Sequence, residues 1–154
     1  MKLKTELNEL LVDIFHTILK YELKMINYST KQDLSMREIH LLEIVGKKPK
    51  GITISDIAKN FGITLASTTV MAQKLESRNL LIRNRNETDA RSNLLTLSQE
   101  GKTIDNHHHD FHMNMINKIT SGLTELEEAI LYEFIKKLNQ FFSNEASQLE
   151  NPKK

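Results

Sequence analysis

The chain contains no cysteine among its 154 residues, which excludes disulfide bonds, a thiolate nucleophile and a thiolate metal site. Its five glycines form no glycine-rich phosphate loop, and neither an H-E-x-x-H nor a G-x-S-x-G pattern occurs. The carboxylates do not pair on one apolar face of a predicted helix. We therefore expect a protein that is not an enzyme and that needs no cofactor.

Long apolar runs are also absent. No stretch approaches the roughly 18 apolar residues that a membrane-spanning helix needs, and residues 1–9 are polar and charged, unlike the apolar part of a secretory signal. The sequence therefore predicts a cytoplasmic protein without a membrane partner. Its length fits one domain, or one domain with appended helices.

Charge is distributed unevenly along the chain, although the net charge is only +1. Residues 46–93 hold nine Lys or Arg against four Asp or Glu, a net charge of +5, which leaves −4 for the rest. A basic middle between acidic ends indicates a central element that meets a polyanion. Charge alone does not separate this interpretation from chance clustering on a solvated surface.

The N-terminal segment predicts one long helix with a wide apolar stripe. Such a stripe indicates burial against a second chain or against a layer of other helices. A polar break is expected at residues 27–33. The apolar residues recur at steps of three and four: Leu7, Leu10, Leu11, Ile14, Phe15, Ile18, Leu19, Met25 and Ile26.

Three shorter helices are predicted next. Ser35 and Glu38 form a capping box that starts the first of them, and Gly46 is expected to follow its last turn. The second covers about residues 54–61. The third begins after Thr64 and runs to about residue 78.

The last two of these helices form a predicted helix-turn-helix, joined at Gly62. The second helix of such a unit presents short polar and small side chains to DNA, and its N-terminus suits a phosphate. Ser and Thr can bond base edges or phosphates, while Met and Ala can touch a thymine methyl group. The inward face is predicted to consist of Leu65, Val70 and Leu75. The predicted DNA-facing residues are Ser55 of the first helix and Thr64, Ala66, Ser67, Thr68, Met71 and Lys74 of the second.

A β-hairpin is predicted directly after the helix-turn-helix. Its first strand contains residues 80–82, and Leu95 and Leu97 alternate with polar residues on its second strand. A basic hairpin in this place is a wing, whose arginine can enter a narrow minor groove. Asp89 could orient Arg91 there, or could simply start a turn. The candidate DNA-binding residues are Arg83, Arg85, Asn86, Thr88, Asp89 and Arg91.

Two further helices complete the prediction. Residues 98–101 lead into a long helix that ends near Ser121–Gly122. Thr124 then caps the last helix, and the tail from Gln148 is polar. The apolar residues of the last helix are Leu126, Ile130, Leu131, Phe134, Ile135, Leu138, Phe141 and Phe142.

Residues 80–101, LLIRNRNETDARSNLLTLSQEG, resemble the wing of MarR-type winged helix-turn-helix regulators. The shared pattern comprises an apolar pair, an arginine-bearing strand, D-x-R, alternating apolar residues and Ser-x-x-Gly. The flanking helices also match. Ala90 departs from the pattern by replacing a common arginine, and Asn79 by replacing a common glycine. Because Asn tolerates the left-handed conformation, the second departure should cost little.

The resemblance implies a mainly α fold with a small β-hairpin wing. It divides the chain into an N-terminal dimerisation helix with linker (1–34), a winged helix-turn-helix DNA-binding domain (35–100) and C-terminal dimerisation helices (101–154). The implied protein is a homodimeric regulator, taken here as a repressor, that binds double-stranded DNA. Two-fold symmetry then predicts a pseudo-palindromic operator with half-sites about one helical turn apart.

A narrower resemblance points to an effector. Residues 36–47, 108–112 and 118–128 are similar to the fatty-acid-synthesis repressors of Gram-positive bacteria. This implies that acyl carrier protein bearing a long acyl chain acts as corepressor. The alternatives are a small phenolic ligand, or ordinary core and dimer packing of the same residues. The residues that could line space for an acyl chain are Phe15, Ile18, Leu19, Met25, Met113 and Ile116.

A run of histidines raises a rival interpretation. His108 and His112 are four residues apart, so they share one helix face at a spacing that suits zinc. Glu38, His40 or Glu22 could add ligands. Some regulators of the resembled family sense zinc in this region, but their sites include a cysteine, so we favour no metal. A third alternative is a pH-sensitive patch, since four imidazoles lie at residues 107–112.

Overall fold

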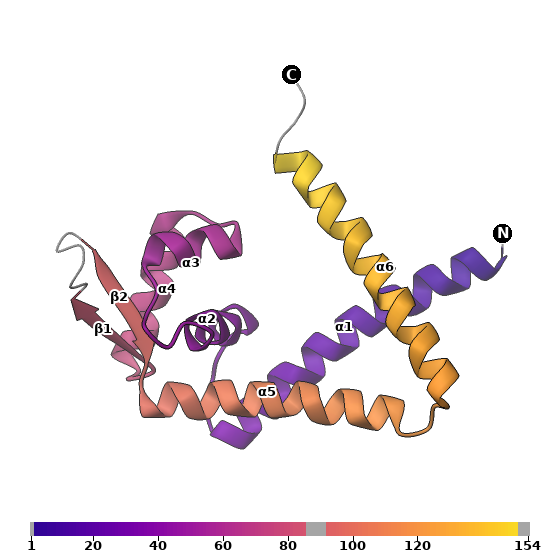
Figure 1. The fold of residues 1–154 in the computed structure, drawn as a ribbon. Helices are drawn as coiled ribbons and strands as arrows, with labels where there is room; N and C mark the ends of the chain where they lie inside the picture. Colours follow the sequence, from indigo (N-terminus) through magenta and orange to yellow (C-terminus); the bar gives the residue numbers. More distant parts are fainter. Residues whose placement is uncertain (1, 86–91, 151–154) are drawn as a thin grey trace. The chain divides into compact units, whose positions relative to one another are not determined.

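The computed structural model describes residues 2–85 and 92–150 (Figure 1). Within these residues the chain is mainly helical with one two-stranded antiparallel sheet, which confirms the predicted fold class. None of the described helices is long and apolar enough to cross a membrane. In chain order the elements are α1 (Lys2–Thr30), α2 (Met36–Gly46), α3 (Ile54–Phe61), α4 (Leu65–Ser77), β1 (Leu81–Arg85), β2 (Asn93–Leu97), α5 (Gln99–Thr120) and α6 (Glu125–Glu150).

The chain divides into two compact units, Met1–His112 and Met113–Lys154, and the division falls inside α5. The first unit contains α1 to α4, the hairpin and the first half of α5. The second contains the end of α5 and all of α6. The functional division at residues 34 and 100 stays a prediction.

Helix α2 begins after Ser35 and ends at Gly46, as predicted, but Gly46 does not have the predicted role. The Ser35 hydroxyl accepts from the Glu38 backbone N–H at 3.3 Å, and Glu38 Oε2 accepts from the Ser35 N–H at 2.7 Å, which completes the capping box. Gly46 does not follow the helix but belongs to its last turn, and Lys47 is the C-terminal cap. A Cβ at this position would lie 2.1 Å from Asp105 Oδ2, so a larger residue would require the Asp105 side chain to move.

The helix-turn-helix forms as predicted. Thr53 caps α3, and its hydroxyl accepts from the Asp56 N–H at 3.1 Å. Gly62 ends α3 with φ of 62°, the left-handed conformation that glycine adopts freely. Thr64 caps α4 and accepts from the Ser67 N–H at 3.2 Å. These caps fix where α4 starts and therefore which of its side chains face outward.

The hairpin pairs β1 with β2 in register from Leu81↔Leu97 to Arg85↔Asn93. Ile52, before α3, adds an antiparallel bridge to Leu95, with hydrogen bonds of 3.1 and 2.8 Å. This third segment could not be predicted, because a single bridging residue has no periodicity. The bridge joins the hairpin to the loop that precedes the helix-turn-helix.

The Ser-x-x-Gly pattern has a structural cause at the start of α5. The Ser98 hydroxyl donates to the Asn79 carbonyl at 2.6 Å and accepts from the Gly101 N–H at 3.0 Å. A Cβ on Gly101 would lie 2.1 Å from the Leu80 carbonyl oxygen, so no larger residue fits. Asn79 has φ of 58°, which confirms the expected left-handed conformation.

The core of the first unit lies among α2, α3, α4 and the hairpin. Helix α1 contributes only two buried residues, Glu22 and Ile26, and continues to Thr30 through the predicted polar break. Asn27 explains the continuation, because its side chain bonds both the N–H and the carbonyl of Leu34 and so satisfies the backbone beyond the helix. The fully buried apolar residues include Ile39, Leu41, Leu42, Ile57, Ala72, Leu75, Leu80 and Leu95.

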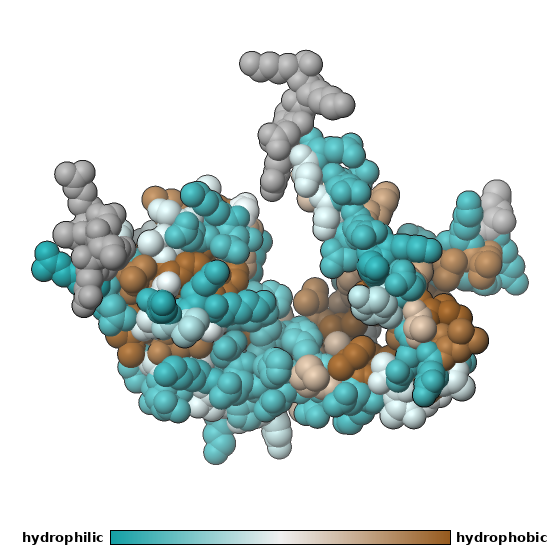
Figure 2. Space-filling view, viewed as in Figure 1, coloured by the Kyte–Doolittle hydropathy of each residue, from teal (hydrophilic) through white to brown (hydrophobic). Residues whose placement is uncertain are grey.

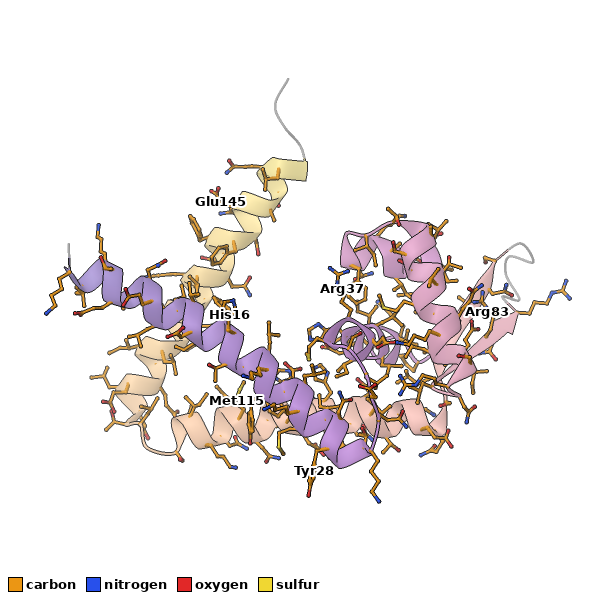
Figure 3. All side chains as sticks on the ribbon, turned by 180° about the vertical axis from the view of Figure 1, so that it is seen from behind. His16, Tyr28, Arg37, Arg83, Met115 and Glu145 are labelled. Carbon is orange, nitrogen blue, oxygen red and sulfur yellow. The ribbon has the colours of Figure 1, made fainter. Side chains whose placement is uncertain are left out.

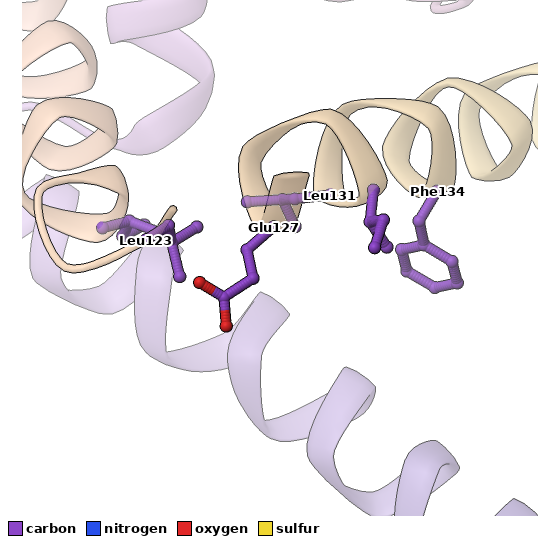
Figure 4. A pocket seen from close by; sticks show the side chains of 6 residues that line it. Leu123, Glu127, Leu131 and Phe134 are labelled. Atoms are coloured by element: carbon purple, nitrogen blue, oxygen red, sulfur yellow. The ribbon is translucent and has the colours of Figure 1, made fainter. Parts of the chain in front are cut away.

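The second unit has no core of its own within the described part of the chain. None of the residues from 113 to 149 is buried. Thr124 caps α6 as predicted, with Glu127 completing the capping box. An open apolar groove runs along the start of α6 (Figure 4), and Figure 2 shows hydrophobic surface left uncovered outside the helix-turn-helix. The groove is lined by Ile119, Leu123, Glu127, Ile130, Leu131 and Phe134.

Candidate nucleic-acid interface and a buried histidine cluster

Helix α4 turns a different face inward from the predicted one. Thr68 is fully buried, and its hydroxyl donates to the Thr64 carbonyl at 3.0 Å. Met71 is half-buried against the core. The prediction that Thr68 and Met71 lie on the exposed face is therefore wrong. Residue type did not predict their exposure, because threonine can bond its hydroxyl to a carbonyl of its own helix and methionine packs readily into a core.

The outward face of α4 is small and apolar at its centre. Val70 is 66% exposed and Leu65 is 53% exposed, so the prediction that they pack inward is also wrong. Ala66, Val70 and Gln73 are all exposed and are spaced by four and three residues, which places them on one helix face. Ser67 is exposed as predicted.

Lys74 is tied to α2. Its Nζ lies 2.7 Å from Oε1 of Glu38, whose side chain is almost fully buried. Burial would raise the pKa of Glu38, but the Lys74 ammonium and the Ser35 N–H lower the pKa below its ordinary value. Among the described residues Glu38 Oε1 has no aligned hydrogen bond, so the Lys74 charge is what compensates its burial. Lys74 therefore joins α4 to the capping box of α2.

Arg83, which lies on β1 (Figure 3), is also held by an ion pair. Its Nε and Nη2 donate to the two carboxylate oxygens of Glu76, both at 2.8 Å, which raises the pKa of the guanidinium. The pair fixes β1 to α4 and occupies two of the guanidinium N–H donors, while the DNA contact of Arg83 stays a prediction. Arg85 and Ser55 are exposed. The other predicted wing residues, Asn86, Thr88, Asp89 and Arg91, lie outside the described residues.

Three histidines surround the buried Glu22, of which only 1% is exposed. His108 is buried as well, whereas the side chains of His40 and His112 are 36% and 42% exposed. Glu22 Oε1 lies 2.5 Å from His108 Nε2, 3.2 Å from His112 Nε2 and 3.8 Å from His40 Nε2. The two ring nitrogens of His108 and His112 are 3.0 Å apart. Helices α1, α2 and α5 thus bring four donor groups to one point.

The electrostatics of this cluster favour an ionised Glu22. Burial would raise its pKa, but hydrogen bonds to His108 and His40 outweigh burial and lower the pKa from 4.5 to about 2. The pKa of His40 is raised, first by its hydrogen bond to Glu22. A buried carboxylate needs a compensating positive charge, which a protonated histidine or a bound cation supplies.

The donor set also fits a transition metal. Ligand atoms about 2.0–2.1 Å from a tetrahedral zinc ion lie about 3.3 Å from one another, and the separations measured here are 2.5 to 3.8 Å. The donor atoms of Glu22, His40 and His108 all lie within 4.8 Å of one another. The other ring nitrogen of His108, Nδ1, lies 3.9 Å from a carboxylate oxygen of Glu43, where an orienting partner is usual.

Sequence reasoning identified parts of this cluster. The pair His108 and His112 is predicted from its spacing, and of the three further candidates the structure brings His40 and Glu22 to it. Glu38 does not join, since it bonds Lys74 instead. The rest of the histidine run, residues 107 and 109, is exposed.

The residues predicted to line an acyl-chain space fall in both units. Phe15, Leu19 and Met25 of the first unit are 40–49% exposed, and Ile18 is partly buried. Met113 and Ile116 of the second unit are 46% and 42% exposed. Each is therefore open to a ligand or a partner, and the pocket itself stays a prediction.

Comparison with known proteins agrees with this architecture. A family model described as MarR family matches residues 34–92. The structure of Streptococcus pneumoniae FabT in complex with DNA is similar over 92% of this chain and 98% of that one, with 32% identity and a TM-score of 0.85. The YusO protein of Bacillus subtilis is similar over 90% and 96%, with 26% identity and a TM-score of 0.71.

A curated relative adds a functional name. The HTH-type transcriptional repressor MdtR of Bacillus subtilis is 30% identical over 82 residues, which are 53% of this chain. The match spans about half the length of that repressor. MdtR is named as a transcriptional repressor, and the FabT structure contains DNA, which agrees with the predicted regulator rather than an enzyme.

Proposed function

Because the chain belongs to the MarR family of winged helix-turn-helix DNA-binding transcription regulators, we propose that it is a repressor which binds a pseudo-palindromic operator as a homodimer. The exposed face of α4 is the main observation behind this proposal. Helix α4 is a capped helix of a helix-turn-helix, and its outward side chains Ala66, Val70 and Gln73 are exposed. A role on chromosomal DNA also implies that the protein works in the cytoplasm.

The second unit supports the homodimer. Its large apolar side chains are exposed in the single chain, including Ile130 at 61% and Phe134 at 55%. Each such side chain gains about 1.5–3 kcal/mol when it is fully buried, so a second copy that covers this groove is a strong source of stability. A two-fold dimer presents two copies of α4 and therefore reads two inverted half-sites.

The wing provides further candidate contacts. Arg85 is exposed on β1, and we propose that it and Arg91 meet the minor groove, with Asn86, Thr88 and Asp89 beside them. Arg91→Ala should weaken DNA binding by at least ~1 kcal/mol while the dimer persists. Unchanged affinity would refute the minor-groove role of Arg91.

Fluorescence anisotropy with a selected operator duplex tests the proposal as a whole. Binding should weaken steeply as salt concentration rises, with a slope set by the number of phosphates contacted. A scrambled duplex of the same composition should bind much more weakly. Equal affinity for both duplexes, or no dependence on salt, would refute sequence-specific binding.

The genes under control are proposed from the narrower resemblance. Residues 36–47 and 108–112 resemble fatty-acid-synthesis repressors, and the similarity to FabT extends over nearly the whole chain. We therefore propose that the operators lie at fatty-acid-synthesis genes and that long-chain acyl carrier protein is the corepressor. Affinity for such a promoter fragment should rise when the acylated carrier is added at fixed salt, and the carrier without its acyl chain is the control. An affinity that ignores the acylated carrier would refute this corepressor.

Zinc is the second candidate effector, and the cluster at Glu22 favours it. Three imidazoles and one ionised carboxylate form the kind of nitrogen and oxygen set that zinc accepts. Because four nitrogen and oxygen donors already meet at Glu22, the lack of a cysteine does not by itself exclude a metal here. No comparable observation favours a small phenolic ligand, which stays an untested alternative.

Titration with zinc tests whether the cluster at Glu22 binds a metal. A tetrahedral site should bind zinc in competition with a chromophoric chelator, and His108→Ala should lose that binding. His107→Ala is the matched control, because His107 lies on the same helix but is exposed. Equal zinc binding by both variants would show an adventitious surface site and refute this candidate.

A further inference from the structure

The outward face of α4 has an unusual chemical character for a surface that meets DNA. At its centre Ala66, Val70 and Gln73 follow one another along the helix, and none of them carries a charge. Val70 leaves 66% of its surface exposed, although valine is normally among the more buried residues. Nothing in the fold of the chain requires a β-branched apolar residue at that position.

Lys74 and Arg83, two of the cations predicted to meet DNA, are paired with carboxylates. Lys74, which comes next along the helix, lies against the buried Glu38 carboxylate at 2.7 Å. Arg83 of β1 is bound through two donors to Glu76. The centre of the face therefore offers methyl groups and one carboxamide rather than phosphate-binding charges.

These groups match one kind of base pair. In the major groove only thymine presents a methyl group, and a Gln side chain bonds adenine through N6 and N7. We propose that Ala66 and Val70 read thymine methyl groups and that Gln73 reads a neighbouring adenine, so that the operator half-site is specified mainly at A·T pairs. This inference rests on the proposed placement of α4 in the major groove.

The placement of Val70 follows from the burial pattern of α4. Thr68, Ala72 and Leu75 are fully buried and define the inward face. Residues 66, 70 and 73 lie on the opposite side, where the helix meets a groove. Val70 therefore takes the role that the sequence had suggested for Met71, which packs against the core instead.

Replacing thymine with deoxyuridine tests this directly, because it removes only the 5-methyl group. The operator is first obtained by selecting duplexes from a random pool with the full-length protein. Each thymine of a half-site is then replaced singly, and the dissociation constant is measured at fixed salt. Burial of one methyl group predicts a loss of about threefold to fivefold at the thymines that are read.

A double-mutant cycle assigns the contact to Val70. In the Val70→Ala variant the deoxyuridine penalty at one position should shrink to less than about 1.5-fold, while penalties elsewhere persist. Thymines outside the half-sites serve as controls on the DNA. Because Val70 is exposed, Val70→Ala should fold normally, which thermal melting checks.

The outcomes separate this inference from the proposed function. A selected operator in which no thymine methyl affects binding would overturn the methyl reading and leave the repressor standing. A uniform loss for Val70→Ala on every duplex would overturn it as well, because a specific contact must depend on the base. If no sequence is enriched from the pool, the proposed function itself fails.

Discussion

The ion pair between Glu38 and Lys74 yields a quantitative prediction about how α2 and α4 are held together. Glu38 is nearly fully buried, whereas the Lys74 side chain is 58% exposed. Removing one partner of a fully buried pair costs about 3–5 kcal/mol. Since solvent screens the lysine, we expect a coupling energy between the two side chains of about 1–2 kcal/mol.

A double-mutant cycle with Glu38→Gln and Lys74→Met measures that coupling. Glutamine keeps an acceptor for the Ser35 N–H, so the cycle isolates the charge rather than the capping box. The free energy of unfolding is obtained from urea titrations followed by circular dichroism at pH 7. The protein concentration is held constant, because dimerisation adds to apparent stability.

The exposed pair Glu43 and Lys47 is the matched control. It spans four residues of one helix region, and both groups are reached by solvent. Its coupling should be about 0.3–0.5 kcal/mol. If the Glu38–Lys74 coupling is no larger than that of this control, the reasoning that burial strengthens the tie is refuted.

Three more predictions follow from single features of the fold. Because the pKa of Glu38 is lowered in the folded protein, the carboxylate stabilises the fold fully above the unfolded pKa near 4.5, and this contribution is lost as pH falls below it. In Glu38→Gln the melting temperature should therefore fall less between neutral and acid pH. An unchanged fall would contradict this. Gly101→Ala should lower the free energy of unfolding in urea by more than about 2 kcal/mol, since its Cβ would lie 2.1 Å from the Leu80 carbonyl oxygen. Gly62→Ala, which has open space but a φ of 62°, should lower it by about 1 kcal/mol. Equal losses would refute the steric argument. Phe134→Ser should shift the protein toward monomer in light scattering at micromolar concentration, and an unaltered dimer would place the interface elsewhere.

Local sequence signals predicted the helix ends well. The capping box at Ser35 and the cap at Thr64 each depend on residues three positions apart, so they can be read without knowing the fold. The left-handed conformation of Asn79 likewise follows from one backbone position. The predicted role of Gly46 as the residue after α2 was wrong. Gly46 lies inside the helix and faces Asp105, which is distant in sequence, so this environment could not be predicted.

The face of α4 could not be predicted from residue type alone. A short helix with mixed polar and small side chains has a weak apolar stripe, so its phase depends on tertiary packing. Buried Thr68 and exposed Val70 reverse the usual preference of their side chains. The pair His108 and His112 could be predicted because its i, i+4 spacing is local, whereas the choice of Glu22 and His40 over Glu38 depends on how other helices pack against α5.

Selection of duplex DNA from a random pool, followed by sequencing, tests the central claim most directly. A homodimer that reads DNA through two copies of α4 should enrich a pseudo-palindrome whose half-sites lie about one helical turn apart. Enrichment of a single asymmetric site would contradict the dimeric arrangement. No enrichment over the starting pool would contradict sequence-specific DNA binding altogether.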